Sequence, residues 1–264
     1  AQSVFAAKKG TGYMPEINKA LAEMEADGTT QQIYDKYFSA DNATPSSWDL
    51  VKTNAWPMAW KAIAVTIPLT AISFVVGLAL ALVTAIGRMS TSALPRGLAR
   101  AYISVIRGTP LLVQLFLIFY ALPEIGVDFP PFVAAVIALS LNVGGYAAEI
   151  IRSAIESIPR GQWEAAQTIG MSRTTALRRI ILPQAARTAI PPLSNTLISL
   201  LKDTSLTSII LVVELTQAAR FAAAPTFQYM PMFGLAALYY WIICTVLSLV
   251  QDRAEERFSR YVAA

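Results

Sequence analysis

Few residues of this sequence could take part in catalysis. There is no histidine, and the single cysteine, Cys244, lies within an apolar run. A Ser-His-Asp triad, a Cys-His pair, a histidine-ligated metal and an internal disulfide are therefore excluded. The nucleophile-and-base arrangement that remains is a Ser-Lys dyad, in which Lys202 would activate Ser199 or Ser205. We expect no catalytic residue and no metal site.

Polar side chains inside apolar stretches indicate a second kind of chemistry, the passage of a polar solute through a membrane. Lys202 could meet a substrate carboxylate, and Asp203 or Asn195 its ammonium group. The predicted substrate path consists of Gln114, Asn142, Asn195, Ser199, Lys202 and Asp203. Each has another interpretation: hydrogen bonds between helices for the asparagines, an ion pair between Lys202 and Asp203, and packing for Gln114.

Long apolar elements must position these residues. The sequence has 264 residues, of which 55% are hydrophobic and 14% charged, whereas soluble domains carry about 25% charged residues. Residues 62–87, 129–148 and 221–251 contain no Asp, Glu, Lys or Arg at all. Each run is long enough for the roughly 18–20 residues that cross a bilayer as a helix. The sequence therefore predicts an all-α integral membrane protein.

Five transmembrane helices are expected. They cover about residues 58–86, 101–122, 131–150, 185–213 and 232–251. Pro68 predicts a kink in the first helix. Pro191-Pro192 and the Lys202-Asp203 step predict that the fourth is interrupted, as in the broken helices of transporters.

The third of these helices has two further features. Gly144-Gly145 predicts a close approach of neighbouring helices, because glycine lets backbones come together. Glu149 lies near one end of the helix, where we expect it to pair with Arg152 three residues later.

Arginines alternate between the connecting segments and predict the orientation. The rich segments contain Arg88, Arg96, Arg100 and Arg107, then Arg152, Arg160, Arg173, Arg178, Arg179 and Arg187, and finally Arg253, Arg257 and Arg260. The other segments are poor in both Lys and Arg. Because cytoplasmic loops carry the excess of basic residues, we expect the N-terminus outside and the C-terminus in the cytoplasm. The net charge of +4 then reflects topology, and no nucleic-acid partner is expected.

The N-terminal part differs from the rest of the chain. Residues 1–57 contain lysines and seven acidic residues but no arginine, whereas residues 62–264 contain one lysine and fourteen arginines. Residues 15–38 have apolar stripes at helical spacing, divided at Gly28, which favours a helix end. We therefore expect an extracytoplasmic segment over 1–40, a linker over 41–57 and a membrane domain over 58–258.

The segment 152–187 is too charged to cross a membrane and too apolar for a loose loop. The pattern predicts one short helix over 162–169 with Glu164 in its first turn, a break at Gly170, and a second helix capped by Ser172 and ending before Pro183. The small Ala165 and Ala166 would let a partner approach closely. An interfacial helix pair without a partner is the alternative.

This segment resembles the EAA loop of binding-protein-dependent ABC importers. The matching residues are Glu164, Ala165, Ala166, Gly170, Ile180, Leu182 and Pro183. Arg107-Gly-Thr-Pro-Leu111 and Lys202-Asp-Thr-Ser-Leu206 resemble segments of the polar amino acid uptake family. The resemblance covers about residues 55–258 and implies the type I ABC importer permease fold, with five transmembrane helices and a cytoplasmic coupling helix.

The resemblance also implies partners and a mechanism. The EAA loop would dock on a cytoplasmic ABC ATPase dimer, and transport would proceed by alternating access. No G-x-x-x-x-G-K-[ST] occurs in the sequence, so ATP and Mg would be bound by that ATPase and no cofactor by this chain. A second permease copy is required, and a homodimer is expected. Residues 1–40 resemble the C-terminal end of an amino acid binding protein, which implies a binding domain fused upstream.

Two other classes of function and several substrates stay open. A secondary carrier or channel would need acidic residues at mid-membrane, and the Ser-Lys hydrolase would need Lys202. The expected function is import of a polar L-amino acid across the bacterial inner membrane. The run from Ala185 to Asn195 resembles the cystine-type branch, but glutamine, glutamate, arginine and histidine permeases differ little in these motifs.

Overall fold

The computed structural model describes residues 14–38 and 45–259, which form two compact units divided between Ser46 and Ser47. In the first unit, α1 (Met14–Ala26) and α2 (Thr29–Phe38) are joined at Gly28, whose φ of 79° suits glycine. The predicted helix end at Gly28 is confirmed. Hydrogen bonds from Thr29 lower the pKa of the exposed Asp27 at this turn.

The second unit begins with one continuous helix of 42 residues, Ser47–Arg88. It comprises α3 (Ser47–Lys61), a π-helical turn η2 (Ala62–Thr66) and α4 (Ile67–Arg88), with Pro68 in the first turn of α4. The predicted linker over 41–57 is therefore wrong from Ser47 onward, while residues 39–44 lie outside the described residues. The helix extends this far because Leu50 and Met58 are buried against residues of the C-terminal half of the chain.

The predicted second helix is not straight. α5 (Ala93–Gly108) is followed by α6 (Leu111–Phe116), the π-helical turn η3 (Leu117–Ala121) and the 3-10 turn η4 (Leu122–Ile125). The chain bends by 106° between α5 and the α6–η4 segment. Thr109 is extended, with φ −122° and ψ 144°, because a residue before proline is disfavoured in the helical region. Pro110 thus makes a sharp corner in an apolar stretch.

α7 (Pro131–Glu156) is the central helix of the membrane unit. A Cβ on Gly145 would lie 2.6 Å from Ile106 Cγ2, and one on Gly144 would lie 2.5 Å from the Tyr102 hydroxyl. A Cβ on Gly77 of α4 would likewise lie 2.7 Å from Val143 Cβ. Glycines therefore let α4 and α5 pack closely on α7, which confirms the prediction for Gly144 and Gly145.

The remaining helices are α8 (Arg160–Thr168), α9 (Arg173–Ala176), the π-helical turn η5 (Leu177–Ile181), α10 (Leu182–Asp203), the 3-10 helix η6 (Thr204–Ile210), α11 (Leu215–Ala223) and α12 (Tyr229–Ser259). α10 contains Pro191 and Pro192 without ending there. After Asp203 the α-helix continues directly as the 3-10 helix η6, and the axis turns by 49° at the break between Ile210 and Leu215. The α-helix thus passes through the prolines and ends at the predicted Lys202-Asp203 step, whereas the bend itself lies farther along the chain, after Ile210.

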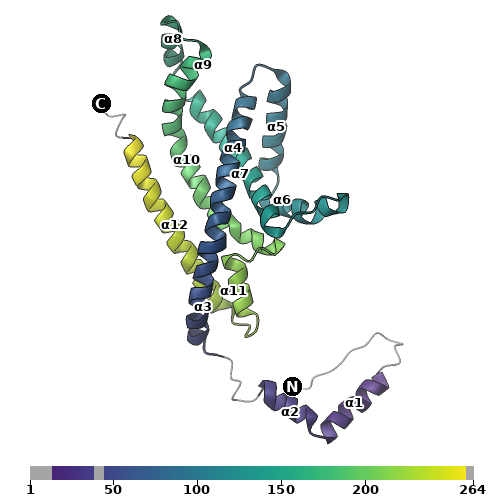
Figure 1. The fold of residues 1–264 in the computed structure, drawn as a ribbon. Helices are drawn as coiled ribbons and strands as arrows, with labels where there is room; N and C mark the ends of the chain where they lie inside the picture. The colour runs from purple at the N-terminus through teal and green to yellow at the C-terminus, as the bar shows by residue number, and fades with distance from the viewer. Residues whose placement is uncertain (1–13, 39–44, 260–264) are drawn as a thin grey trace. The chain divides into compact units, whose positions relative to one another are not determined.

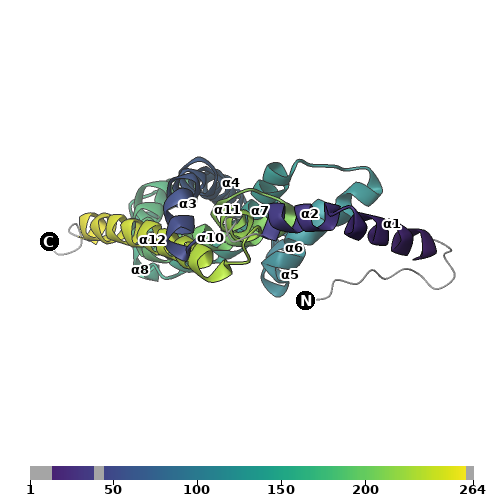
Figure 2. The same ribbon diagram turned by 90° about the horizontal axis from the view of Figure 1, so that it is seen from below.

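Three helices of the described chain are long and apolar enough to cross a membrane, and there are five candidates if each bent pair counts as one. The α4–α5 connection, α8 with α9, and the end of α12 lie at the same end of the membrane unit (Figure 1). Seen from below, α12 and α5 lie on opposite sides of α7 (Figure 2). The segments rich in arginine are therefore gathered at one end, except that Arg107 lies at the opposite end of α5.

Candidate functional site

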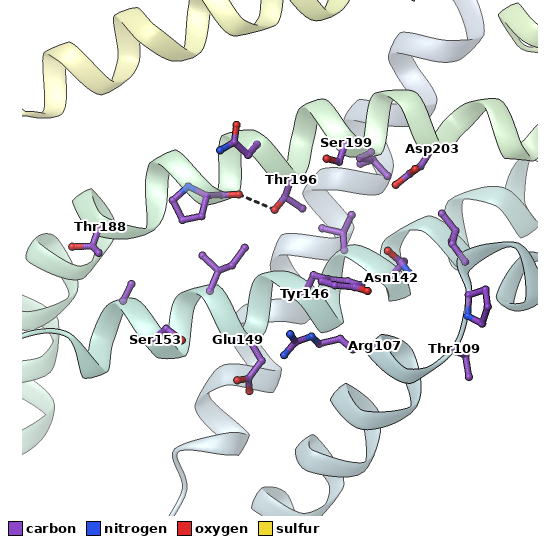
Figure 3. A pocket seen from close by; sticks show the side chains of 18 of the residues that line it. Arg107, Thr109, Asn142, Tyr146, Glu149, Ser153, Thr188, Thr196, Ser199 and Asp203 are labelled. Carbon is purple, nitrogen blue, oxygen red and sulfur yellow. Dashed lines mark hydrogen bonds between the residues drawn. The ribbon is translucent and has the colours of Figure 1, made fainter.

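A cavity of about 1050 Å³ lies between α5, α7 and α10. Its wall contains side chains of both charges and several hydrogen-bonding groups (Figure 3). The charged and amide side chains in the lining are Arg107, Asn142, Glu149, Asn195 and Asp203. A cavity with cationic and anionic groups fits a zwitterionic solute better than an apolar one.

The structure brings together four of the six residues predicted for the substrate path. Asn142, Asn195, Ser199 and Asp203 all line the cavity. Lys202 lies outside the lining and is exposed. It also does not appear with Asp203 among the ion pairs of the described residues, because adjacent residues of a helix point about 100° apart. The expected ion pair is therefore wrong.

Gln114 is buried, with 7% of its surface exposed, and does not line the cavity. Its Nε2 donates to the carbonyl oxygens of Ile106 at 2.9 Å and Thr109 at 3.2 Å and to Thr109 Oγ1 at 3.0 Å. Its Oε1 accepts a hydrogen bond from Asn142 Nδ2 at 3.2 Å. The expectation that Asn142 would bond between helices is thus confirmed, although Asn142 also lines the cavity.

The cation in the cavity is Arg107, which was not predicted as a site residue. Its guanidinium lies over the Tyr146 ring, with Cζ 5.5 Å from the ring centroid. Both residues are exposed to the cavity (Figure 3). The sequence held a signal for this role, because Arg107 lies between two apolar stretches immediately before the Gly-Thr-Pro corner.

Glu149 of α7 lies in the cavity wall and is paired with arginines. Arg152 donates to Glu149 Oε2 from Nη2 at 2.8 Å and from Nε at 3.1 Å, and it also bonds Glu156. Arg88 Nε lies 4.0 Å from Glu149 Oε1. The predicted Glu149–Arg152 pair is confirmed, and Arg88 of α4 extends it to a second helix.

The helix–turn–helix predicted over 152–187 is present as α8 and α9. Gly170 lies between them with a φ of 77°, and Ser172 Oγ accepts from the Thr175 N–H at 3.3 Å as the N-cap of α9. α8 begins at Arg160, after Pro159, so Glu164 lies in its second turn and not its first. The second helix does not end before Pro183, because its last turn is π-helical and Pro183 falls in the first turn of α10.

The motif residues divide into exposed and buried ones. Glu164, Ala165, Leu182 and Pro183 are exposed, and Ile180 is half-buried. Ala166, in contrast, is 1% exposed, and its carbonyl accepts from the Met171 N–H at 3.0 Å. Ala166 therefore packs inside the chain and cannot form the surface for a partner that was expected of it. Ala165 alone of the two alanines fits that role.

A polar group missed in the sequence is Glu214. Its side chain is fully buried and caps α11, accepting from the N–H groups of Thr216 and Gln217 at 2.8 Å each. The Tyr240 hydroxyl of α12 donates to the same carboxylate at 2.7 Å. Glutamate is not among the favoured N-cap residues, so the sequence carried no clear N-cap signal for it.

Comparisons with known proteins agree with this geometry. Residues 77–260 match the family described as binding-protein-dependent transport system inner membrane component. The L-cystine transport system permease protein TcyB of Bacillus subtilis (strain 168) is 55% identical over 221 residues, which are 83% of this chain and 94% of that protein. The glutamine transport system permease protein GlnP of Escherichia coli (strain K12) is 37% identical, covering 76% of this chain and 96% of its own.

The fold is also found in a solved structure. The crystal structure of an amino acid ABC transporter with histidines matches 81% of this chain and 99% of its own, with a TM-score of 0.76 and 35% identity. The chain therefore belongs to the binding-protein-dependent inner membrane component family and is the multi-pass inner-membrane permease subunit of an ATP-driven amino acid importer, working with an ATPase and a solute-binding protein.

Proposed function

We propose that this permease imports L-cystine, and that the cavity between α5, α7 and α10 is its substrate path. The observation that carries the proposal is a cavity lined by both a cation and carboxylates, in a chain 55% identical to an L-cystine permease protein. Cystine has an ammonium and a carboxylate at each end, so it needs hydrogen-bond donors and acceptors along its path.

Arg107 takes the role first expected of Lys202. Its guanidinium can bind a substrate carboxylate with two parallel hydrogen bonds, and Tyr146 supports the guanidinium from one side. Asp203, Asn195 and Ser199 follow one face of α10 at intervals of four residues and line the opposite wall. They are the acceptors for the ammonium group.

Coupling to ATP hydrolysis rests on the α8 segment. Glu164 and Ala165 are exposed there, and Trp163 packs α8 onto a cluster that includes Ile155, Ile181 and Ala185. A displacement of α8 would therefore move α7 and α10, the two helices that carry most of the cavity lining. ATP and Mg would be bound by the ATPase dimer, and α8 would act as the coupling helix.

The proposed assembly contains two copies of this permease. Alternating access needs two membrane subunits around one path, and a homodimer is the simplest arrangement for a chain that supplies one set of cavity residues. The arginine-rich end faces the cytoplasm, with the N-terminus outside. Residues 1–40 would be the last part of a solute-binding domain fused upstream, and α1 and α2 fit such a piece because they form a unit separate from the membrane domain.

Uptake in proteoliposomes tests the proposal. The permease, its ATPase and the complete binding domain are reconstituted, and radiolabelled L-cystine uptake is measured with ATP inside or outside. We expect uptake that requires ATP on the side of the ATPase and is competed by unlabelled L-cystine more than by glutamine, glutamate, arginine or histidine. Stronger competition by one of these would identify another substrate, and uptake without any ATPase would favour a secondary carrier.

A further inference from the structure

We infer that Gln114 is a positioning residue that holds Asn142 with its amide oxygen toward the cavity, as an acceptor for the substrate ammonium group. The inference rests on the proposed role of the cavity as the substrate path. Gln114 is buried and absent from the lining, so it acts through Asn142 without touching the substrate.

The orientation of the Gln114 amide is determined by the corner between α5 and α6. The last carbonyl groups of a helix have no partner within that helix, and Gln114 Nε2 donates to those of Ile106 and Thr109. Thr109 Oγ1 uses its own proton in a 2.8 Å bond to the Val105 carbonyl, so toward Gln114 it can only accept. Three acceptors around one atom require that this atom be the NH2 group.

The orientation of Asn142 follows from that of Gln114. With Nε2 held at the corner, Gln114 presents Oε1 to α7, and Oε1 can only accept. Asn142 must therefore donate its Nδ2, as it does at 3.2 Å. If Asn142 were turned over, two oxygens would face each other without a proton between them. Asn142 Oδ1 is consequently the atom left for the cavity that this residue lines.

The arrangement suits the two charged groups on the α-carbon of an amino acid. Arg107, at the end of α5, offers only donors, and Asn142 Oδ1 offers only an acceptor. The positions of Arg107 and Asn142 both depend on the corner between α5 and α6. Gln114 is hydrogen-bonded to Ile106, next to Arg107 at the end of α5, and also to Asn142. The side chains of Arg107 and Asn142 flank Tyr146 in the cavity (Figure 3). Gln114 thus fixes the spacing of a carboxylate site and an ammonium site.

Binding measurements without the binding domain test this. The permease with its ATPase is placed in nanodiscs, and calorimetry gives the Kd of L-cystine and of N,N′-diacetyl-L-cystine, which lacks the ammonium charge. For the wild type we expect L-cystine to bind at least about tenfold more tightly than N,N′-diacetyl-L-cystine. Gln114→Leu should reduce this preference to about twofold or less. The control Ser140→Ala removes a buried hydroxyl with no hydrogen-bond partner among the described residues from α7, the helix that carries Asn142, and should keep the preference.

Two variants of Asn142 test the acceptor independently of the corner, in case Gln114→Leu does not assemble. Asn142→Leu should lose the preference for L-cystine. Asn142→Asp should keep it, because either of its oxygens is an acceptor toward the cavity, but a lower melting temperature is expected since its other oxygen would face Gln114 Oε1 without a proton between them. In the double variant Gln114→Leu, Asn142→Leu the loss should be no larger than in Asn142→Leu alone. The inference would be overturned if the losses of the two single variants multiplied in the double variant. It would also be overturned if Gln114→Leu or Asn142→Leu kept the wild-type preference.

The two proposals fail in different ways. If the wild type binds no L-cystine, the proposed substrate is wrong, and the same variants are measured with L-glutamine and N-acetyl-L-glutamine, because every amino acid carries the ammonium group. If the wild type binds neither amino acid while ATP-driven uptake persists, the inference about Gln114 is overturned and the transport function stands.

Discussion

The Tyr240 hydroxyl donates a 2.7 Å hydrogen bond to the carboxylate of Glu214, which is fully buried. This bond joins the middle of α12 to the N-terminus of α11, and Thr66 Oγ1 accepts from the neighbouring Leu215 N–H at 3.3 Å. Three segments that are distant in sequence therefore meet at one polar cluster within an apolar surrounding. Such a cluster fixes relative position, because each member would lose its partner if one element moved.

Removing the Glu214 carboxylate should loosen this junction. Glu214→Ala leaves the N–H groups of Thr216 and Gln217 without an acceptor and leaves the Tyr240 hydroxyl only Thr216 Oγ1 at 3.2 Å, at an expected cost of about 2–4 kcal/mol. Tyr240→Phe should cost only about 1 kcal/mol. Thermal unfolding in detergent measures both, with Thr245→Ala, an exposed position on α12, as the control. An unchanged melting temperature for Glu214→Ala would show that water replaces the carboxylate.

The contact of α7 with α5 should not tolerate an added methyl group. Gly145→Ala would place Cβ 2.6 Å from Ile106 Cγ2, and relieving such overpacking costs about 1–3 kcal/mol. Gly234→Ala is the matched control, since its Cβ would meet no atom within 4 Å and alanine favours a helix. We expect a lower melting temperature for the first and an equal or higher one for the second. Ile106→Ala, which removes the contacted Cγ2, should cost less in the Gly145→Ala background than in the wild type.

The architecture was largely predictable, because a run of apolar residues long enough to cross a bilayer has few alternatives. The corner at Thr109 was not, since apolar residues continue on both sides and hydropathy averages over it. Its local signal was Pro110, which disfavours a helical Thr109, although Pro191 and Pro192 lie within α10 without ending it. The length of α3 was missed because its polar exposed face resembles a linker, while Leu50 and Met58 are buried by residues that follow far along the chain.

For the site, the sequence identified polar residues but not their directions. Asp203 and Lys202 are neighbours in sequence, yet only Asp203 lines the cavity. Gln114 and Asn142 are 28 residues apart, and their hydrogen bond depends on the corner that hydropathy did not reveal. Ala166 was assigned to a partner surface by its size alone, whereas its burial depends on how the chain turns at Gly170.

Replacing Gly170 should impair coupling through its backbone and not through its side chain. A Cβ there would meet no atom within 4 Å, but the φ of 77° is strained for most residues. Gly170→Ala should cost about 1 kcal/mol or slightly more, whereas Gly170→Asn should cost less, because asparagine tolerates this conformation. ATP-driven uptake should be highest in the wild type, lower in Gly170→Asn and lowest in Gly170→Ala. Gly161→Ala is the control, because its Cβ would also meet no atom within 4 Å. Equal loss in both variants would point to steric exclusion by the ATPase.

The support that Tyr146 gives to Arg107 should depend on the aromatic ring and not on the hydroxyl. Tyr146→Phe keeps the ring face under the guanidinium, 5.5 Å from Cζ, and should leave L-cystine uptake nearly unchanged. Tyr146→Leu removes a cation–π interaction of about 0.5–1 kcal/mol and should lower uptake by about two- to fivefold. Arg107→Gln should abolish most uptake, since it removes the charge that meets the carboxylate. If Tyr146→Phe were as impaired as Tyr146→Leu, the hydroxyl would be the group that matters, and the ring would serve only to carry it.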